Sequence, residues 1–445
     1  MAYREFDEIN LSRRSLLRGG AVLGAGAAIA GLPAGSGLLA RTSAQARDLR
    51  AQFPTVAGLV DRYVDARKVA NMVAIMGWGQ DAPGTIAKGN LAIGQNQPAG
   101  IDSLYRIYSM SKPITGMATM ILIDEGKLGL DQPLAEILPP YAKMQVQKTY
   151  DGSITDVVAA ERPITIRHLL THTAGIGYNI VQKGPIKDAY NQRGIIGGQV
   201  SKLPIAQALL GDYDAAPSLA TFADRLAGLP LVYQPGTKWS YSNSIDLLGR
   251  VIEVASGESF ASFLQNRIFE PTGMTSTWFR VPASEVGRLT TNYGVMNGTL
   301  IPLDPARLSI FLDQPPFPAG GGGLVSSPRD YDRFLRMLLG YGAIDGKRVM
   351  SERAVRLGTS DILPEGVNTA GTYAAGSGYG AGGRVSDGSY GWAGAAGTVG
   401  AVNFKAGLRA GLFTQYMPSE AYPAQSEFTA AVLADVGSMA MKKAG

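Results

Sequence analysis

Segments with strand character lie near both ends of the chain, and helical patterns dominate the stretch between them. Short apolar runs bounded by turn residues cover 72–77, 85–93, 398–404 and 409–416, which predicts strands at these positions. No repeat and no linker rich in Gly and Ser divides the chain. We therefore expect one α/β (α+β) unit that is built from both chain ends and carries a helical insertion at roughly 127–320.

Apolar residues at helical spacing predict six helices. In the first, Val56, Val60 and Val64 recur every four residues, which places them on one helix face. Ser327 and Pro328 form a pair typical of a helix start. The predicted helices cover 54–68, 109–125, 245–255, 259–268, 328–339 and 425–440.

The composition excludes several classes of protein. The chain has 445 residues, of which 45% are hydrophobic, as expected for a folded globular protein. It has no Cys, which excludes disulfides, thiolate metal sites and a cysteine nucleophile. Its two histidines, His168 and His172, are too few for a three-His metal centre, and we expect no metal and no cofactor. The net charge of +5 is spread along the chain, so a nucleic-acid partner is not expected.

Residues 1–46 have the features of an export signal. Arg13 and Arg14 precede an uncharged run at 19–40, and Ala44–Ala46 has the small-x-small pattern of a cleavage site. The paired arginines resemble a twin-arginine signal peptide.

A retained membrane anchor is the alternative for this segment, because the run at 19–40 is about long enough to span a bilayer. Its glycines and Pro33 make it a poor helix, however. We therefore expect a chain of residues 47–445 that is periplasmic or secreted and has no stable membrane partner.

Ser109 and Lys112 form a Ser-x-x-Lys motif at the start of the helix predicted at 109–125. Three residues apart on a helix, the hydroxyl and the amine lie on one face within hydrogen-bond reach. A partly desolvated lysine can take the proton of serine, which is otherwise a weak nucleophile, and the helix N-terminus supplies N–H groups for an oxyanion. Such a short motif also arises by chance, and the alternative is an exposed Ser and Lys that begin a core helix.

Tyr241 and Asn243 form the only Tyr-x-Asn motif of the chain, shortly before the helix predicted at 245–255. A tyrosine beside a cation can act as general base and then return the proton to a leaving group. Asn243 offers a donor and an acceptor, suited to holding Lys112 and a substrate carbonyl. The alternative is a turn tyrosine followed by an ordinary helix cap.

Trp392, Gly394 and Ala395 belong to a run of small residues that opens the C-terminal β region. Small residues let a substrate lie directly against the backbone of a strand. The N–H of Ala395 is a candidate second oxyanion donor beside that of Ser109. The alternative is a glycine-rich hairpin with one packing tryptophan.

In chain order, these three motifs resemble the serine β-lactamase and penicillin-binding-protein superfamily, in its class C-like branch, and most closely the family VIII carboxylesterases. Flanking segments agree with this resemblance at Tyr105–Tyr108, His168–Gly175, Pro235–Gly236 and Gly320–Gly323. The similarity covers essentially all of 54–440. It implies a β-lactamase-like fold, with an antiparallel sheet flanked by helices and an all-helical lobe.

The resemblance also implies a two-step acyl transfer. Ser109 would be the nucleophile, and Lys112 and Tyr241 would share the base and acid work as a coupled pair. Asn243 would position Lys112 and the substrate, and the backbone N–H groups of Ser109 and Ala395 would bind the oxyanion. Water would then hydrolyse the acyl-enzyme.

Two departures from the family patterns bear on the substrate. Trp392 stands where class C β-lactamases carry the lysine of a Lys-Thr-Gly motif, whose charge helps to bind the carboxylate of the antibiotic. An apolar wall in place of this cation favours neutral acyl esters. The esterases usually show Trp-Gly-Gly, whereas this chain has Ala393 in the middle, and a methyl that pointed inward would narrow the cleft.

We therefore expect an exported serine hydrolase, namely a carboxylesterase that acts on small-molecule acyl esters. Two alternatives stay open: a β-lactamase, amidase or peptidase for D-residue or cell-wall peptides with the same catalytic residues, and a catalytically silent relative that serves as a binding protein. An α/β-hydrolase is excluded because the chain has no Gly-x-Ser-x-Gly elbow. His168 and His172 are accordingly expected to be structural.

Overall fold

An eight-stranded sheet forms the centre of the protein, in the order β1-β3-β2-β16-β15-β14-β13-β12. The computed structural model describes residues 47–204, 214–367 and 369–444, so the predicted signal at 1–46 lies outside the described residues. All neighbouring strands of the sheet are antiparallel except β1 and β3. From edge to edge the strands are β1 (Arg47–Asp48), β3 (Gly84–Gly89), β2 (Asn71–Trp78), β16 (Leu408–Phe413), β15 (Val399–Asn403), β14 (Ser389–Ala393), β13 (Arg384–Ser386) and β12 (Gly378–Tyr379).

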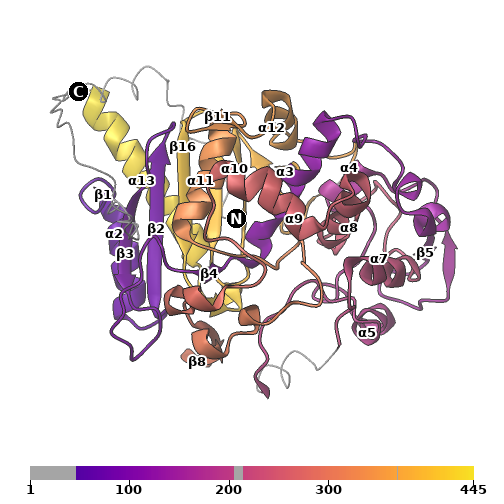
Figure 1. The fold of residues 1–445 in the computed structure, drawn as a ribbon, viewed down its shortest axis with the longest axis horizontal. Coiled ribbons are helices and arrows are strands. Elements are labelled where there is room, and N and C mark those ends of the chain that lie inside the picture. The colour runs from indigo at the N-terminus through magenta and orange to yellow at the C-terminus, as the bar shows by residue number, and fades with distance from the viewer. Residues whose placement is uncertain (1–46, 205–213, 368, 445) are drawn as a thin grey trace, which may run out of the picture.

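Strands β2 and β16 join the two ends of the chain inside this sheet. Their antiparallel register pairs Val73 with Phe413 and Ile75 with Gly411. Figure 1 shows the indigo N-terminal strands beside the yellow C-terminal ones. Segments from both ends of the described chain therefore lie in one sheet, in the mixed α/β arrangement that the sequence predicts.

Helices cover both faces of the sheet (Figure 1). On one face, α2 (Pro54–Asp65) packs against α13 (Ala424–Ala444), and these helices share a hydrophobic cluster with the sheet. On the other face, α3 (Ser111–Asp124) and α11 (Pro328–Leu339) belong to a second cluster. The sheet is thus buried on both faces, as in a layered α/β architecture.

Helix α3 runs through the core rather than along the surface. All its residues from Ser111 to Leu122 are buried, and α8 (Ser244–Ser256) and α12 (Glu352–Gly358) pack against it. A helix that is surrounded on all sides by protein is a core element. Its position forces the side chain of Lys112 into the interior, where that residue is fully buried.

Residues 127–320 hold the remaining helices together with two small hairpins. Their helices are α4 (Ile166–Leu170), α5 (Gly184–Gln192), α7 (Leu219–Ala227), α8, α9 (Phe260–Leu264) and α10 (Glu270–Thr272). Strand β5 (Gln145–Gln147) pairs with β6 (Val157–Ala159), and β7 (Asn292–Met296) pairs with β8 (Thr299–Asp304) and with β17 (Tyr416–Met417). Short pairs of strands outside this region are β4 (Tyr105–Arg106) with β9 (Val325–Ser326) and β10 (Ala343–Ile344) with β11 (Lys347–Arg348).

Several predicted elements end at other residues in the structure: the helix predicted at 54–68 ends at Asp65, the strand at 409–416 ends at Phe413, and the helix at 425–440 continues to Ala444. The strand predicted at 85–93 stops at Gly89, which has a φ of 89° and where a Cβ would lie 2.3 Å from the carbonyl oxygen of Ala70. The helix predicted at 259–268 changes after α9 into a π-helical turn at Gln265–Phe269. Among the described residues, none of the helices combines the length and the apolar character needed to cross a bilayer.

Candidate active site

Ser109 lies at a turn between a strand and a helix. Strand β4 leads into a 3-10 turn at Tyr108–Met110, and α3 begins only at Ser111, so the predicted helix start at residue 109 is two residues early. Tyr108 has a φ of 41°, a backbone conformation that costs a non-glycine residue on the order of 1–3 kcal/mol. A strained residue therefore stands directly before the candidate nucleophile.

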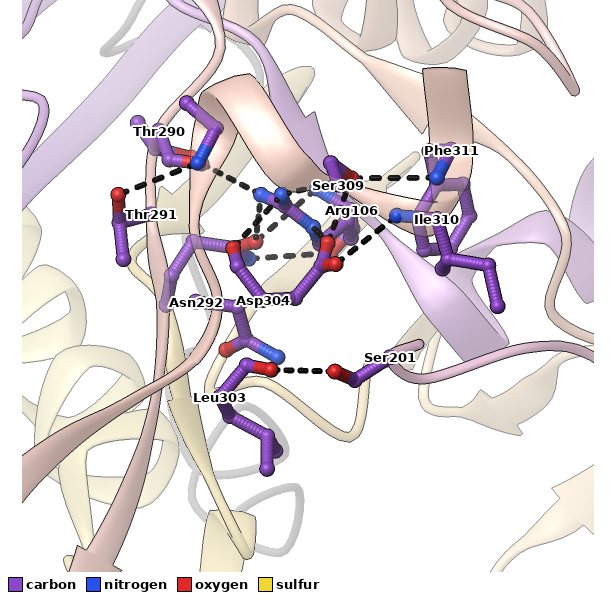
Figure 2. A network of polar contacts seen from close by, with 12 residues as sticks. Arg106, Ser201, Thr290, Thr291, Asn292, Leu303, Asp304, Ser309, Ile310 and Phe311 are labelled. Carbon is purple, nitrogen blue, oxygen red and sulfur yellow. Dashed lines mark hydrogen bonds and ion pairs between the residues drawn. The ribbon is translucent and has the colours of Figure 1, made fainter. Parts of the chain in front are cut away.

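A buried polar network holds the chain just before this turn (Figure 2). Arg106 is fully buried and forms an ion pair with Asp304, in which Nε and Oδ2 are 2.6 Å apart. The same guanidinium donates to Ser309 Oγ at 3.0 Å and to the carbonyl oxygen of Thr290. Removing one partner of a buried ion pair is strongly destabilising. The network thus fixes the segment that leads to Ser109.

The three predicted catalytic side chains meet at one oxygen. Nζ of Lys112 donates to Oγ of Ser109 at 3.2 Å, and the hydroxyl of Tyr241 donates to the same atom at 2.7 Å. The hydroxyl groups of Ser109 and Tyr241 can rotate about their C–O bonds, so each oxygen can donate or accept a hydrogen bond. An amine and a phenol are therefore both placed where they can take the proton of Ser109.

The amine of Lys112 is buried between aromatic rings and a carbonyl group. Nζ lies 4.5 Å from the ring centroid of Tyr241 and 5.9 Å from that of Tyr178, and such contacts attract an ammonium group. It also donates to the carbonyl oxygen of Gly321 at 2.6 Å. This acceptor could not be predicted from the sequence because a backbone carbonyl has no side-chain signature, and only the run Gly320–Gly323 pointed toward this segment.

Asn243 does not hold Lys112 in the way that the family pattern implied. Its Nδ2 donates to the carbonyl oxygen of Gly177 at 3.3 Å, and its Oδ1 is buried with no hydrogen-bond partner among the described residues. The carbonyl group of Gly321 is the acceptor for Lys112 instead. Asn243 thus keeps one free acceptor.

Trp392 contacts Tyr241 through both its ring and its N–H group. The ring centroids are 5.9 Å apart, and Nε1 donates to the hydroxyl oxygen of Tyr241 at 3.4 Å. This donor supplies a hydrogen bond to the oxygen that would handle the proton of Ser109. Both rings belong to an aromatic cluster, whose members are Tyr178, Trp239, Tyr241, Ala374, Tyr379 and Trp392. An uncharged wall therefore lies beside the candidate nucleophile.

Gly394 and Ala395 lie in the turn that follows β14. A Cβ on Gly394 would be 2.4 Å from the carbonyl oxygen of Ile107, so only glycine lets this turn lie against the chain that precedes Ser109. Ala395 shares a hydrophobic cluster with Tyr108. The turn is thus next to the nucleophile segment, although the role of the Ala395 N–H as an oxyanion donor stays a prediction.

The methyl group of Ala393 does not point into the cleft. Successive side chains of a strand face opposite sides of the sheet. Trp392 belongs to the aromatic cluster, whereas Ala393 packs against the cluster that the sheet shares with α2 and α13. Only a methyl that pointed inward would narrow the cleft, and the methyl of Ala393 does not.

The two histidines contact the protein in ways that fit the expected structural role. His168 forms a capping box with Thr165 at the start of α4, and burial lowers the pKa of His168 to about 4. Nδ1 of His172 lies 2.8 Å from Oγ of Ser242. Burial, and then the charge of Lys112, holds the pKa of His172 well below its usual value. In the part of the chain that the structure describes, no group of three or more acidic, His or Cys side chains is arranged to hold a metal ion.

Comparisons with known proteins agree with this architecture. Residues 44–434 match the family model described as Beta-lactamase. Protein Rv1367c of Mycobacterium tuberculosis (strain ATCC 25618 / H37Rv) is 38% identical over 272 residues, which cover 60% of this chain and 62% of that protein. Esterase EstB of Burkholderia gladioli is 28% identical over 297 residues, or 62% of this chain and 68% of that protein. This chain therefore spans less than two thirds of the length of Rv1367c.

One solved structure extends the likeness over nearly the whole fold. EstCE1, described as a hydrolase with promiscuous acyltransferase activity, has a TM-score of 0.70 and 23% sequence identity, and the likeness covers 86% of this chain and 99% of that one. At this identity the likeness concerns the fold. Together with the family match, which runs through nearly all of the described residues, it shows that the chain belongs to the Beta-lactamase family.

Proposed function

We propose that the protein is a serine hydrolase that cleaves neutral acyl esters through an acyl-enzyme formed on Ser109. The observation that carries this proposal is the contact of Ser109 Oγ with both Lys112 Nζ and the Tyr241 hydroxyl. A nucleophile needs an adjacent group that takes its proton, and here two such groups are in place. The relative EstB is named an esterase, which supports ester cleavage.

In the proposed reaction, Oγ of Ser109 attacks the ester carbonyl carbon and its proton passes to the pair formed by Lys112 and Tyr241. The backbone N–H groups of Ser109 and Ala395 stabilise the oxyanion of the tetrahedral intermediate. The C–O bond then breaks, and the alcohol leaves with the proton held by the pair. Water then attacks the acyl group, and the pair formed by Lys112 and Tyr241 takes a proton from it. The pair returns this proton to Oγ of Ser109 as the acid leaves, which restores the enzyme.

The aromatic wall supports a preference for uncharged substrates. Trp392 takes the place at which a lysine binds the carboxylate of lactam antibiotics in the class C enzymes that the sequence resembles. A carboxylate brought against the ring of Trp392 would lose hydration without gaining an ion-pair partner from it, which is costly. An apolar acyl or alcohol group gains free energy at the same surface.

The test is a substrate profile of the purified chain against p-nitrophenyl butyrate, the lactam nitrocefin and a D-alanyl-D-alanine peptide. We expect turnover of the ester to exceed that of the other two, and Ser109→Ala to abolish it while circular dichroism shows an intact fold. Preferred cleavage of the lactam or the peptide would contradict the ester assignment. Failure of a fluorophosphonate probe to label Ser109 would instead indicate a catalytically silent relative.

We also propose that residues 1–46 direct export by the twin-arginine route. The paired Arg13 and Arg14 and the cleavage pattern at Ala44–Ala46 support this. Replacing both arginines with lysine should retain the protein in the cytoplasm, and mass spectrometry of the exported wild type should find Arg47 at its N-terminus. Unchanged export of the double variant would contradict the proposal.

A further inference from the structure

A fully buried carboxylate lies close to the site and takes no part in the mechanism described so far. Asp246 belongs to the first turn of α8, and its side chain is inaccessible to solvent. Its Oδ1 accepts the N–H of Gly321 at 2.8 Å, whereas its Oδ2 is buried with no partner among the described residues. Buried acceptors of this kind are rare in folded proteins and call for an explanation.

Asp246 and Lys112 bind the same residue from opposite sides. Asp246 accepts the N–H of Gly321, and Lys112 donates to the carbonyl oxygen of Gly321 at 2.6 Å. Thr115, one turn after Lys112 on α3, donates to the neighbouring carbonyl oxygen of Gly320 at 2.8 Å. The acceptor of the amine is therefore held in place by side chains from both α3 and α8.

The glycines around this carboxylate fit the arrangement. A Cβ on Gly321 would lie 2.6 Å from Oδ2 of Asp246, and a Cβ on Gly197 would lie 2.7 Å from the same atom and 3.1 Å from Oδ1 of Asn243. These distances are shorter than normal van der Waals contacts. The absence of side chains at Gly197 and Gly321 is thus what lets Asp246 approach the backbone that holds Lys112.

We propose that Asp246 is a positioning residue for Lys112: it fixes the carbonyl group of Gly321 that receives the amine, and it places a negative charge beside that amine. The inference rests on the proposed function, since it assigns a partner to the base of that reaction. The start of α8 then provides two parts of the site. Tyr241 lies just before this helix, and Asp246, in its first turn, holds the acceptor of the Lys112 amine.

The ionisable groups around the site define the electrostatic part of this inference. Burial raises the pKa of Asp246, and the charge of Lys112 and the N–H of Gly321 oppose that rise. Burial, followed by the charges of Asp246 and Tyr241, raises the pKa of Tyr178 well above its usual value. His172, whose pKa is lowered by burial and then by Lys112, faces the amine from the end of α4. Lys112 is thus the cation that faces Asp246 across Gly321.

Two substitutions separate the hydrogen bond of Asp246 from its charge. Asp246→Asn keeps an oxygen that can accept from Gly321 but removes the charge, and Asp246→Leu removes both while keeping the number and branching of the side-chain heavy atoms. The matched control is Asp330→Asn. Asp330 is another buried carboxylate, on α11, and it accepts the backbone N–H of Ser276 at 2.6 Å. The readout is the second-order rate of fluorophosphonate labelling of Ser109 in the full chain, measured as a function of pH, with thermal melting as a check of folding.

We expect Asp246→Leu to slow labelling by about 10- to 100-fold, the range found when a reacting group is slightly misplaced. Asp246→Asn should label within a few-fold of wild type at neutral pH, because its side-chain oxygen can still accept the N–H of Gly321. The acid limb of its pH profile should move to lower pH, because a negative charge is lost beside the reacting groups. Asp330→Asn should change the melting temperature and leave the pH profile in place.

Wild-type labelling rates and an unmoved acid limb in both Asp246 variants would overturn the inference and leave the proposed function intact. If Asp246→Leu does not fold, Asp246→Asn decides alone: a shifted acid limb supports the inference, and an unshifted one overturns it. A wild type that the probe does not label would overturn the proposed function, and the inference with it.

Discussion

The hydroxyl of Tyr241 lies 2.7 Å from Oγ of Ser109, although 132 residues separate the two in the chain. Ser109 stands just before α3 and Tyr241 just before α8, and these two helices pack against each other. The contact is therefore set by the packing of helix α8 on a helix that is buried on all sides. Neither side chain could be placed beside the other by local sequence alone.

Removing the phenolic oxygen of Tyr241 should impair the reaction and spare the fold. We expect Tyr241→Phe to lower kcat for p-nitrophenyl butyrate by about 10²- to 10⁴-fold, the usual contribution of a general acid or base, since the ring keeps its place while the proton relay is lost. The matched control is Tyr105→Phe, which removes another buried hydroxyl, one that donates to Asn71 at 2.8 Å. Equal losses of activity in the two variants would contradict the role of Tyr241.

The N–H group of Trp392 offers a smaller and separate test. Trp392→Phe keeps an aromatic wall but removes the donor to the hydroxyl oxygen of Tyr241. One hydrogen bond contributes about 1 kcal/mol, so kcat should fall about fivefold, with little change in KM for a neutral ester. Steady-state kinetics over the pH range checks this, and an unchanged kcat would show that the 3.4 Å contact does not assist Tyr241.

The extent to which the sequence predicts the site differs from residue to residue. Ser109 and Lys112 are three residues apart, so helix geometry alone brings them together, and the structure agrees. Tyr241 stood out through its Tyr-x-Asn motif, but only the resemblance to a family brought it to Ser109, because its approach depends on packing between helices. Gly321 and Asp246 were not predicted at all, since their part in the site arises from a backbone carbonyl and a backbone N–H.

The fold, too, could be predicted only where local sequence signals determine it. The start of helix α2 and both ends of helix α11 were predicted correctly, because apolar spacing and the Ser327 cap are local signals. The strand predicted at 85–93 was too long, because the approach of Ala70 to Gly89 is a tertiary contact. The direction of the Ala393 methyl likewise depends on which face of β14 meets the aromatic cluster.

The orientation of Ala393 leads to a prediction about substrate size. Because its methyl packs on the side of α2 and α13, Ala393→Gly should leave the preference among p-nitrophenyl esters of increasing acyl chain length unchanged. It should instead lower the free energy of unfolding by about 1 kcal/mol, from lost packing and the added freedom of glycine. A gain of activity on long-chain esters, measured as kcat/KM, would show that the methyl limits the cleft after all.

The stability of the protein at acidic pH should depend on His168. In the folded protein the pKa of His168 is about 4, against 6.5 for the ordinary side chain, so the unfolded chain takes up this proton first as pH falls. The stability associated with the neutral ring is fully present above pH 6.5 and is lost as pH falls toward 4. At pH 5 this amounts to about 2 kcal/mol, from about 1.4 kcal/mol for each pH unit.

His168→Gln isolates this effect, because glutamine at the same helix position can complete the capping box with Thr165 and does not titrate. The free energy of unfolding, measured with urea at pH 7 and at pH 5, should fall less in the variant than in the wild type, by about 2 kcal/mol. His172 is present in both proteins, so its own contribution cancels from this difference. Equal losses of stability in the two proteins would mean that His168 is protonated in the folded state, and that its ring is not held in the neutral form by burial.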